Sequence, residues 1–315
     1  MPPATSMSSD RFHVELGPPE ERPETCMQFT FTQKAIKIDA AAGFRDLQLP
    51  QVDGLVLALD WVANDRHHIW GSAVMVAPGV ALTARHVVDE MRAKGFLAEA
   101  GGQLFAVGFH ADRMELWRAD SFTTVDMGDL SLLTLIRTTA PSAAPAEARL
   151  KFSLAIMAAR QPSVGELISL IGFRAADLSF EGRAPMGLAL VGSVGPVADV
   201  YPMRRDTQVL PNPSIGVVAR SVNGMSGGAA FDANGRLIGV ISTGLEEPHS
   251  FVSLSWPATY VPVSPKWPPM LSRAQTSLAA LAKEGLCGIE HLDDVVTWWS
   301  ADGHEMVSIS VPTGL

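Results

Sequence analysis

The chain has 315 residues, of which 47% are hydrophobic and 18% charged, as expected for a well-packed globular protein. Its formal net charge is −9 and it has no basic run, which argues against nucleic acid as a partner. No stretch approaches the ~18 apolar residues of a membrane span, and residues 1–11 lack the apolar core of a secretory signal, so no membrane association is expected. The only cysteines are Cys26 and Cys287, which favours small packing thiols in a reducing, cytoplasmic setting.

The N-terminal part of the chain changes from polar to apolar. Residues 1–25 are rich in proline, serine and charge, which predicts a disordered arm. Residues 27–32 alternate and predict a strand added to a sheet edge, and residues 55–61 predict the first full strand. The polar turn after them contains His67 and His68. A histidine pair can bind metal, but no cysteine or carboxylate cluster lies at ligand spacing, so the sequence favours solvated loop histidines and no metal site.

A histidine stands directly after an apolar hairpin. Residues 72–76 and 80–82 flank an Ala-Pro-Gly turn, and His86 follows in the run Leu-Thr-Ala-Arg-His-Val. Residues 87–95 predict a short helix. A histidine in this position can act as a general base if a carboxylate orients it.

Two aspartates are candidates for that orienting carboxylate. Residues 103–109 and 126–136 predict strands, and Asp126 and Asp129 both stand at the head of the second. We favour Asp129, because the apolar run at residues 130–135 would bury it beside the histidine. Asp126 is the alternative.

The second half of the chain continues the strand pattern. Residues 139–146 are rich in proline and alanine and predict a connection between two domains. Many short strands with glycine and proline punctuation and little helical period indicate an all-β architecture. The strands predicted in this half are residues 165–173, 186–197 and 236–243, and residues 214–219 lead into the next glycine-rich run.

Residues 223–232 crowd glycines around one serine, Ser226. Glycine adopts backbone angles that other residues avoid, so a tight turn here would present the serine side chain. The same turn could aim the N–H groups of Gly224 and Ser226 at one point, as in an oxyanion hole. The alternative is a glycine-rich hairpin with an incidental serine.

Three motifs in this order resemble the chymotrypsin-fold (trypsin-like) serine proteases of the bacterial type. The motifs are Thr-Ala-Arg-His around His86, Asp-Leu-Ser-Leu-Leu from Asp129 and Gly-Met-Ser-Gly-Gly around Ser226, separated by 43 and 97 residues. The resemblance implies two six-stranded antiparallel β-barrels, a C-terminal helix and a small extension. The domains expected are a disordered arm at 1–25, barrels at 26–142 and 143–265, and the extension at 266–315.

The resemblance also implies a function, that of an intracellular serine endopeptidase, expected to be a regulated effector. Ser226 would be the nucleophile, His86 the base, Asp129 its orienter, and Gly224 and Ser226 the oxyanion hole. Ser242 matches the family serine that supports the aspartate, and Ser242, Thr243 and Gly244 match the edge that binds substrate backbone. Protein or peptide substrates, a regulatory protein partner and no cofactor are expected. The alternative is a protease-fold binding module with weak or no turnover.

Two positions concern activation and specificity. Trypsin-like zymogens carry an aspartate just before the nucleophile, and Met225 stands there in this chain, so activation through a new N-terminal ion pair is not expected. The family position at the base of the specificity pocket corresponds to Arg220. That guanidinium would favour acidic substrate side chains. We favour instead a solvent-facing Arg220 or one paired with Glu246 or Glu247, because arginine is almost never buried unpaired. Glutamates near the pocket mouth would favour basic substrate side chains.

The C-terminal part departs from the strand pattern. Apolar residues at helical spacing across residues 270–282 predict an amphipathic helix of about four turns. Residues 295–299 and 306–311 predict two strands joined by a turn. Trp298 and Trp299 in the first strand could anchor a partner, although the packing of one of them in a core is favoured.

Overall fold

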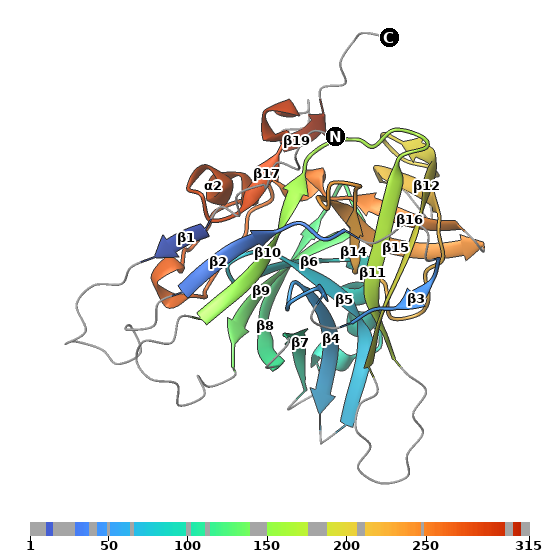
Figure 1. Cartoon of the computed structure of the whole chain (residues 1–315). Helices are drawn as coiled ribbons and strands as arrows, with labels where there is room; N and C mark the ends of the chain where they lie inside the picture. Colours follow the sequence, from blue (N-terminus) through green and yellow to red (C-terminus); the bar gives the residue numbers. More distant parts are fainter. Residues whose placement is uncertain are drawn as a thin grey trace, which may run out of the picture.

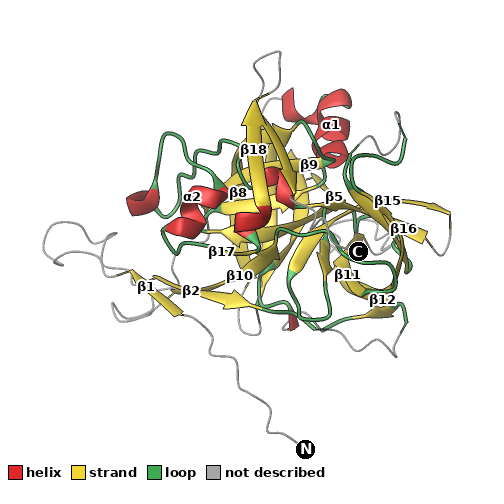
Figure 2. Ribbon diagram, turned by 90° about the horizontal axis from the view of Figure 1, so that it is seen from above, coloured by secondary structure: helices red, strands yellow, loops and turns green. Residues whose placement is uncertain are grey.

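The computed structural model of the chain describes residues 11–14, 29–37, 43–48, 51–63, 66–98, 102–110, 114–138, 150–175, 188–206, 212–246, 249–299 and 305–309. Strands dominate it, and they build two antiparallel barrels whose sides pack together (Figure 1). Seen from above, the short helices lie around the outside of the strands (Figure 2). The all-β fold with two barrels is the one predicted from the sequence.

The first barrel is a closed ring of six strands in the order β4-β5-β6-β9-β8-β7. Gly79, with φ 65°, turns the chain tightly between the second and third strands, as the Ala-Pro-Gly turn predicts. The fifth strand of the chain order, β8, was missed by the sequence analysis because its side chains alternate poorly between buried and exposed. The strands are β4 (Val56–Ala63), β5 (Arg66–Ala77), β6 (Val80–Thr83), β7 (Gln103–Phe109), β8 (Met114–Val125) and β9 (Leu130–Arg137).

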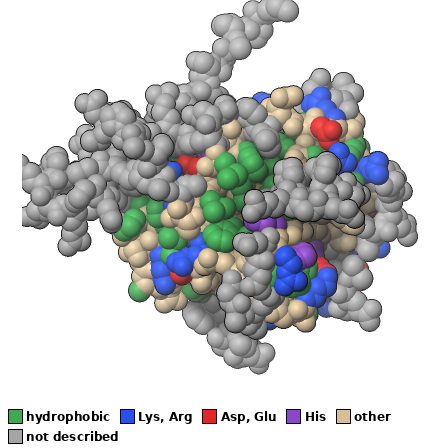
Figure 3. All heavy atoms as spheres, turned by 90° about the horizontal axis from the view of Figure 1, so that it is seen from below, with side chains coloured by type: hydrophobic (Ala, Val, Ile, Leu, Met, Phe, Trp, Pro, Cys, Tyr) green, Lys and Arg blue, Asp and Glu red, His purple; other side chains and the backbone are tan. Residues whose placement is uncertain are grey.

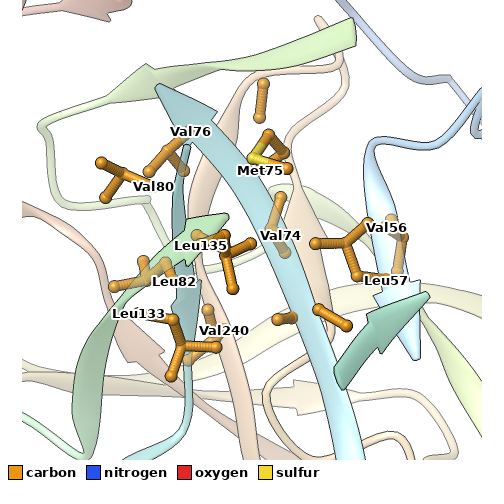
Figure 4. Close-up of a cluster of buried hydrophobic side chains, with 14 of the residues drawn as sticks. Val56, Leu57, Val74, Met75, Val76, Val80, Leu82, Leu133, Leu135 and Val240 are labelled. Carbon is orange, nitrogen blue, oxygen red and sulfur yellow. The ribbon is translucent and has the colours of Figure 1, made fainter. Parts of the chain in front are cut away.

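The inside of this barrel is filled by aliphatic side chains. Val74 of β5, Leu82 of β6 and Leu133 of β9 are fully buried and point toward one another (Figure 4). Burial of each such side chain is worth about 1.5–3 kcal/mol. Val240 belongs to the second barrel but lies in the same cluster, so the hydrophobic core runs from one barrel into the other.

The second barrel is also a ring of six antiparallel strands, β15-β14-β11-β12-β13-β16, closed by pairing of β15 with β16. The sequence predicts three of these strands. It does not predict β13, β14 or β16, because β13 and β14 are short and the sequence of β16, His-Ser-Phe-Val-Ser-Leu, does not alternate. The strands are β11 (Leu167–Ala175), β12 (Leu188–Tyr201), β13 (Ser214–Val218), β14 (Ala229–Phe231), β15 (Leu237–Glu246) and β16 (His249–Leu254).

Strands outside the two rings join the ends of the chain to the barrels. The first strand within the expected second-barrel range of 143–265 is β10 (Leu150–Ala158), but it runs parallel to β2 (Phe29–Lys34) over six residue pairs and meets β15 at only one. Strand β2 confirms the strand predicted at residues 27–32. The prediction of a disordered arm is wrong for β1 (Arg11–Val14), which pairs with β2, and the rest of residues 1–25 lies outside the described residues. A two-residue strand, β3 (Arg45–Asp46), pairs with β12.

The C-terminal part contains less helix than predicted. The chain forms a single turn, η6 (Pro269–Leu271), and then a helix of six residues, α2 (Leu278–Lys283), in place of one helix of four turns. Between them Thr276 pairs with Val263 as an isolated bridge, and the Ser277 side chain caps α2 by accepting from the Ala280 N–H. The remaining elements are η5 (Trp256–Ala258), β17 (Gly288–Glu290), η7 (Leu292–Asp294), β18 (Val295–Trp299) and β19 (Glu305–Ile309).

The hairpin of β18 and β19 confirms the two strands predicted near the C-terminus, and Val295 anchors it in the core of the second barrel. The side chains of Trp298 and Trp299 lie outside the described residues. Cys287 is a free, buried thiol whose pKa is raised to about 12 by burial, as a packing residue should be, and Cys26 lies outside the described residues.

On the face shown in Figure 3, basic and acidic side chains lie in small groups beside hydrophobic ones. No helix among the described residues is both long and apolar enough to cross a membrane.

Candidate active site

His86 follows β6 directly, as predicted, and lies in the first turn of α1 (Arg85–Ala93), which begins two residues earlier than the helix predicted at residues 87–95. Its imidazole Nδ1 is 2.7 Å from Oδ2 of Asp129, and its backbone N–H donates to Oδ1 of the same carboxylate at 2.9 Å. The second bond satisfies one of the N–H groups that a helix start leaves without an intrahelical acceptor. One aspartate therefore fixes both the ring and the backbone of the histidine.

Asp129 is delivered by a turn between β8 and β9, in which the Gly128 N–H donates to the Val125 carbonyl. The Ser242 hydroxyl, from β15 of the other barrel, donates to Oδ2 of Asp129. Burial of the carboxyl acts to raise its pKa, but the hydrogen bonds and charge of His86 and the Ser242 hydroxyl outweigh burial, so the pKa of Asp129 is lowered.

The same contact acts on the imidazole in the opposite sense. Burial favours the neutral ring, but hydrogen bonding and attraction to Asp129, with smaller contributions from Glu90 and Asp89, raise the pKa of His86 above its ordinary value. The ring therefore has a strengthened affinity for a proton, the property that a general base needs.

The loop around Ser226 is a compact turn. The Met225 N–H donates to the Val222 carbonyl, and the Gly227 N–H donates to the Ile241 carbonyl of β15. Gly224 and Gly227 have φ values of +94° and +81°, a region that glycine enters without strain. The glycine-rich run thus forms the tight turn that the sequence predicts.

Two N–H groups of this loop differ from their neighbours. Those of Met225, Gly227 and Gly228 all donate to backbone carbonyls, whereas no carbonyl in the described part of the chain accepts from Gly224 or Ser226. An N–H group without an acceptor needs an explanation. These two groups are available for a ligand.

The Ser226 hydroxyl is bonded to the backbone of Ser242, the residue whose side chain donates to Asp129. Its Oγ donates to the Ser242 carbonyl at 3.3 Å, and no hydrogen bond joins it to His86 within the described residues. Catalytic hydrogen bonds are often long or misaligned in the absence of substrate.

The Ser226 loop packs closely against a strand of each barrel. Gly71 of β5 passes so close that a Cβ there would lie 2.7 Å from the Ser226 carbonyl oxygen. On the other side, a Cβ at Gly172 of β11 would lie 2.8 Å from the Met225 Cα. Separations below 3.0 Å are not tolerated between real atoms of this kind, so both positions require glycine.

A cavity of about 490 Å³ opens beside His86 and Asp129. His86, Ser242 and Thr243 line it, and so does Asp126, the alternative orienter. Asp126 is exposed and stands three residues before the carboxylate that contacts the histidine. Of the two candidate carboxylates, Asp129 is therefore the one bonded to His86 in the described structure, and Asp126 lies in the cavity wall.

The predicted substrate edge lies on β15. The residues Thr243 and Gly244 pair with Phe251 and Ser250 of β16 on one side. On the other side β14 pairs with β15 only as far as Val240, so in the described structure no strand continues along this edge. An extended peptide could be added there.

The structure describes both residues that the sequence links to activation and specificity, Met225 and Arg220. Met225 is fully buried in the core of the second barrel, and its sulfur accepts from the Val222 N–H. Arg220 is exposed, and its guanidinium carbon lies 5.1 Å from the centre of the Phe44 ring. The side chain of Glu246 and all of Glu247 lie outside the described residues. The exposure of Arg220 agrees with the interpretation that we favoured.

The described residues contain no group of three or more histidine, cysteine, aspartate or glutamate side chains that could hold a metal ion. The residues His67 and His68 are exposed on β5, part of a strand where the sequence suggested a turn. His67 Nδ1 is 2.7 Å from Asp60 Oδ2, and burial raises the pKa of that carboxyl.

Sequence analysis missed the contribution of β5 to this site. Ser72 and Thr83 are buried polar residues that join the hairpin to the nucleophile loop, through the bond from Thr83 Oγ1 to the Ser72 carbonyl and from the Ser72 N–H to the Ser226 carbonyl. The one available signal was a Gly-Ser pair, Gly71 and Ser72, in an otherwise apolar strand.

These observations define the class of a chymotrypsin-fold serine protease. A family model described as the trypsin-like peptidase domain matches residues 71–240, so the chain belongs to the trypsin-like peptidase family and is a serine endopeptidase. By sequence, no curated protein matches the chain.

Two solved structures show the extent of structural likeness. The MamO protease domain of Magnetospirillum magneticum has 15% identity and a TM-score of 0.45, over 65% of this chain and 93% of that one. The active form of the Rv3671c protease of M. tuberculosis has 13% identity and a TM-score of 0.43, over 65% of this chain and 77% of that one.

Proposed function

We propose that the chain hydrolyses protein substrates through an acyl-enzyme on Ser226, with His86 as general base and Asp129 as its orienter. The observation that carries the proposal is the hydrogen-bonded series from the Ser242 hydroxyl through Asp129 to His86, adjacent to a serine loop with two available N–H groups. This combination supplies a nucleophile, a base and an anion site together.

Each residue has a defined step. Ser226 Oγ turns from the Ser242 carbonyl toward His86, loses its proton to Nε2 and attacks the peptide carbonyl carbon. The carbonyl oxygen becomes an anion that accepts from the Gly224 and Ser226 N–H groups. His86 then gives the proton to the leaving amine. Water hydrolyses the ester in a second, equivalent cycle, which frees the serine.

The substrate would bind as an extended strand along Ser242, Thr243 and Gly244. Its backbone would take the Ser242 carbonyl as an acceptor, and this is the group that holds the Ser226 hydroxyl in the absence of substrate. Substrate binding would therefore release the nucleophile toward the histidine. The alignment of attacking and attacked atoms supplies much of the rate in such reactions.

Activation does not need a new N-terminus in this proposal. Met225 is buried among apolar side chains and cannot form the ion pair that trypsin-like zymogens use. Removal of residues 1–24 should give the same activity whether the new terminus is free or acetylated. Activity that depends on a free amine would contradict this part of the proposal.

A second candidate function is a protease-fold binding module with little turnover. The observation that favours it is the Ser226 hydroxyl, which donates to the Ser242 carbonyl rather than to His86. In that case the cavity and the β15 edge would bind a peptide without cutting it. A regulated effector that awaits a partner would show the same resting geometry.

Labelling with a fluorophosphonate probe separates the candidates. An endopeptidase should be labelled at Ser226, and Ser226→Ala and His86→Ala should both abolish labelling while each protein keeps its thermal unfolding midpoint. Peptide-library profiling then gives a substrate sequence and tests whether Arg220 contributes to its selection. Absence of labelling in the wild-type protein, with peptides still bound, would support the binding module.

We also propose a reducing compartment for the protein, supported by the free thiol of Cys287. Expression of the tagged chain in its own host, followed by fractionation, tests this. Recovery from an oxidising compartment would exclude it.

A further inference from the structure

We infer that Ser72 is the positioning residue of the oxyanion hole: from the first barrel it holds the carbonyl groups of both residues whose N–H groups bind the anion. This inference rests on the proposed function. Ser72 lies on β5, 14 residues before His86, and is fully buried.

The first contact is made by the side chain. Ser72 Oγ donates to the Gly224 carbonyl at 2.9 Å. The same oxygen accepts from the Phe173 N–H of β11 at 2.8 Å. Because the N–H of Phe173 occupies one lone pair, the hydroxyl proton of Ser72 is directed at the Gly224 carbonyl. The hydroxyl thereby connects a strand of each barrel to the loop.

The second contact is made by the backbone. The Ser72 N–H donates to the Ser226 carbonyl at 2.8 Å, and the Ser72 carbonyl accepts from Thr83 Oγ1 at 2.7 Å. All three polar groups of Ser72 are therefore bonded. A single residue fixes Gly224 and Ser226, and these are the two residues with available N–H groups.

The side-chain contact is the one that matters for the hole. Gly224 has no side chain and a φ of +94°, so its own sequence does little to restrict its rotation. The peptide group after it is held at both edges, since Ser72 binds its carbonyl and the Val222 carbonyl binds its N–H at Met225. Loss of the hydroxyl would free the carbonyl edge and allow Gly224 to turn its own N–H away from the anion.

The test compares Ser72→Ala with the matched control Ser255→Ala. Ser255 is also fully buried, and its hydroxyl also donates to a backbone carbonyl, that of Ile238 at 3.0 Å, but it does not touch the nucleophile loop. Each of the two variants removes one buried serine hydroxyl. Ser72→Cys provides a graded variant of similar size, because a thiol is a weak donor and acceptor.

We expect Ser72→Ala to lower kcat by roughly 10- to 100-fold on the peptide found by library profiling, below the 10²–10³ loss typical of removing a donor outright. KM should change little, because the contact acts on the transition state. Inhibition by the matching peptide aldehyde, which forms a tetrahedral adduct, should weaken in parallel, whereas inhibition by the matching peptide alcohol should not. Ser72→Cys should fall between wild type and Ser72→Ala.

A second measurement does not require turnover. In protein labelled with ¹⁵N-glycine and ¹⁵N-serine, the amide signals of Gly224 and Ser226 should shift and exchange faster with solvent in Ser72→Ala, and stay unchanged in Ser255→Ala. If wild type is active and Ser72→Ala keeps its kcat within about twofold, the inference is wrong and the proposed function stands. Equal kcat losses in both variants would also overturn it. If wild type shows no labelling or turnover, the proposed function has failed, and unchanged amide signals would then overturn the positioning role separately.

Discussion

The two halves of the site are held in place by different forces. On the first barrel, His86 and Asp129 are joined by two hydrogen bonds, and a third arrives from Ser242. On the second barrel, the Ser226 loop is held by hydrogen bonds between uncharged groups, from Ser72 among others, and by close backbone contact with Gly71 and Gly172, and the N–H groups of Gly224 and Ser226 are left open. The position of His86 therefore depends on a charged partner, and that of Ser226 on uncharged contacts and on shape. Mutations of charge and mutations of volume should affect the two halves separately.

The largest effect should come from removing the nucleophile. Ser226→Ala should lower kcat by roughly 10⁶-fold, and His86→Ala by a similar factor, because triad members act as a unit. Neither change should alter the circular dichroism spectrum, since both side chains are only partly buried. Appreciable turnover by either variant would contradict the assignment.

Replacing the carboxylate that contacts His86 should disturb the histidine and leave the Ser226 loop in place. Asp129→Asn should lower kcat by about 10⁴-fold, because an amide cannot stabilise the protonated imidazole or fix its tautomer. Asp126→Asn is the matched control from the same turn, and a far smaller loss is expected because its side chain faces the cavity. If Asp126→Asn causes the larger loss in steady-state kinetics, the wrong carboxylate has been chosen.

Adding a methyl group where β5 contacts the Ser226 loop should disturb the part of the site that depends on shape. A Cβ at Gly71 would meet the Ser226 carbonyl at 2.7 Å, so Gly71→Ala should displace the loop and lower kcat by about 10²-fold. Overpacking of this kind should also destabilise the fold by about 1–3 kcal/mol. The comparison is Gly216→Ala, where the nearest atom to the added carbon is 3.5 Å away. Denaturant unfolding and kinetics should show Gly216→Ala close to wild type. Equal losses of stability and kcat in the two variants would show that the contact at Gly71 has no specific effect on the loop.

The smallest expected effect is a shift in pH dependence. Activity requires neutral His86 and is lost as the pH falls through its pKa, so the raised pKa places the acid limb of kcat/KM above pH 6.5. In Asp129→Asn the largest causes that raise this pKa are removed, whereas burial and the smaller contributions of Glu90 and Asp89 remain, so the pKa of His86 should fall. Titration of the His86 imidazole by ¹⁵N NMR measures both proteins. An acid limb at or below pH 6.5 in the wild type would contradict a raised pKa of His86.

The sequence predicted the two-barrel fold and the positions of most residues of the candidate site, for identifiable reasons. His86, Asp129 and Ser226 stand in short motifs whose neighbours set their local structure, and their catalytic roles stay predictions. Strand β8 has no clear alternation, and the periodic stretch at residues 270–282 is broken by a bridge at Thr276, so local pattern misled there.

Ser72 illustrates a different limit. Its importance comes from contacts with residues 101 and 152 positions away in the chain, Phe173 and Gly224. No window of sequence contains such a relation. A buried serine in an apolar strand indicates that a polar partner exists, but the partner's identity depends on how two barrels meet.

The contacts at Gly71 and Gly172 also make activity sensitive to the distance between the two barrels. Since the nucleophile loop lies between β5 and β11, a separation of the barrels too small to expose either core would already release the loop from one side. During gradual heating or addition of denaturant, loss of activity should then precede loss of secondary structure. A small molecule or protein that binds between the barrels and moves β5 away from the Ser226 loop would inhibit the enzyme reversibly, without competing with substrate.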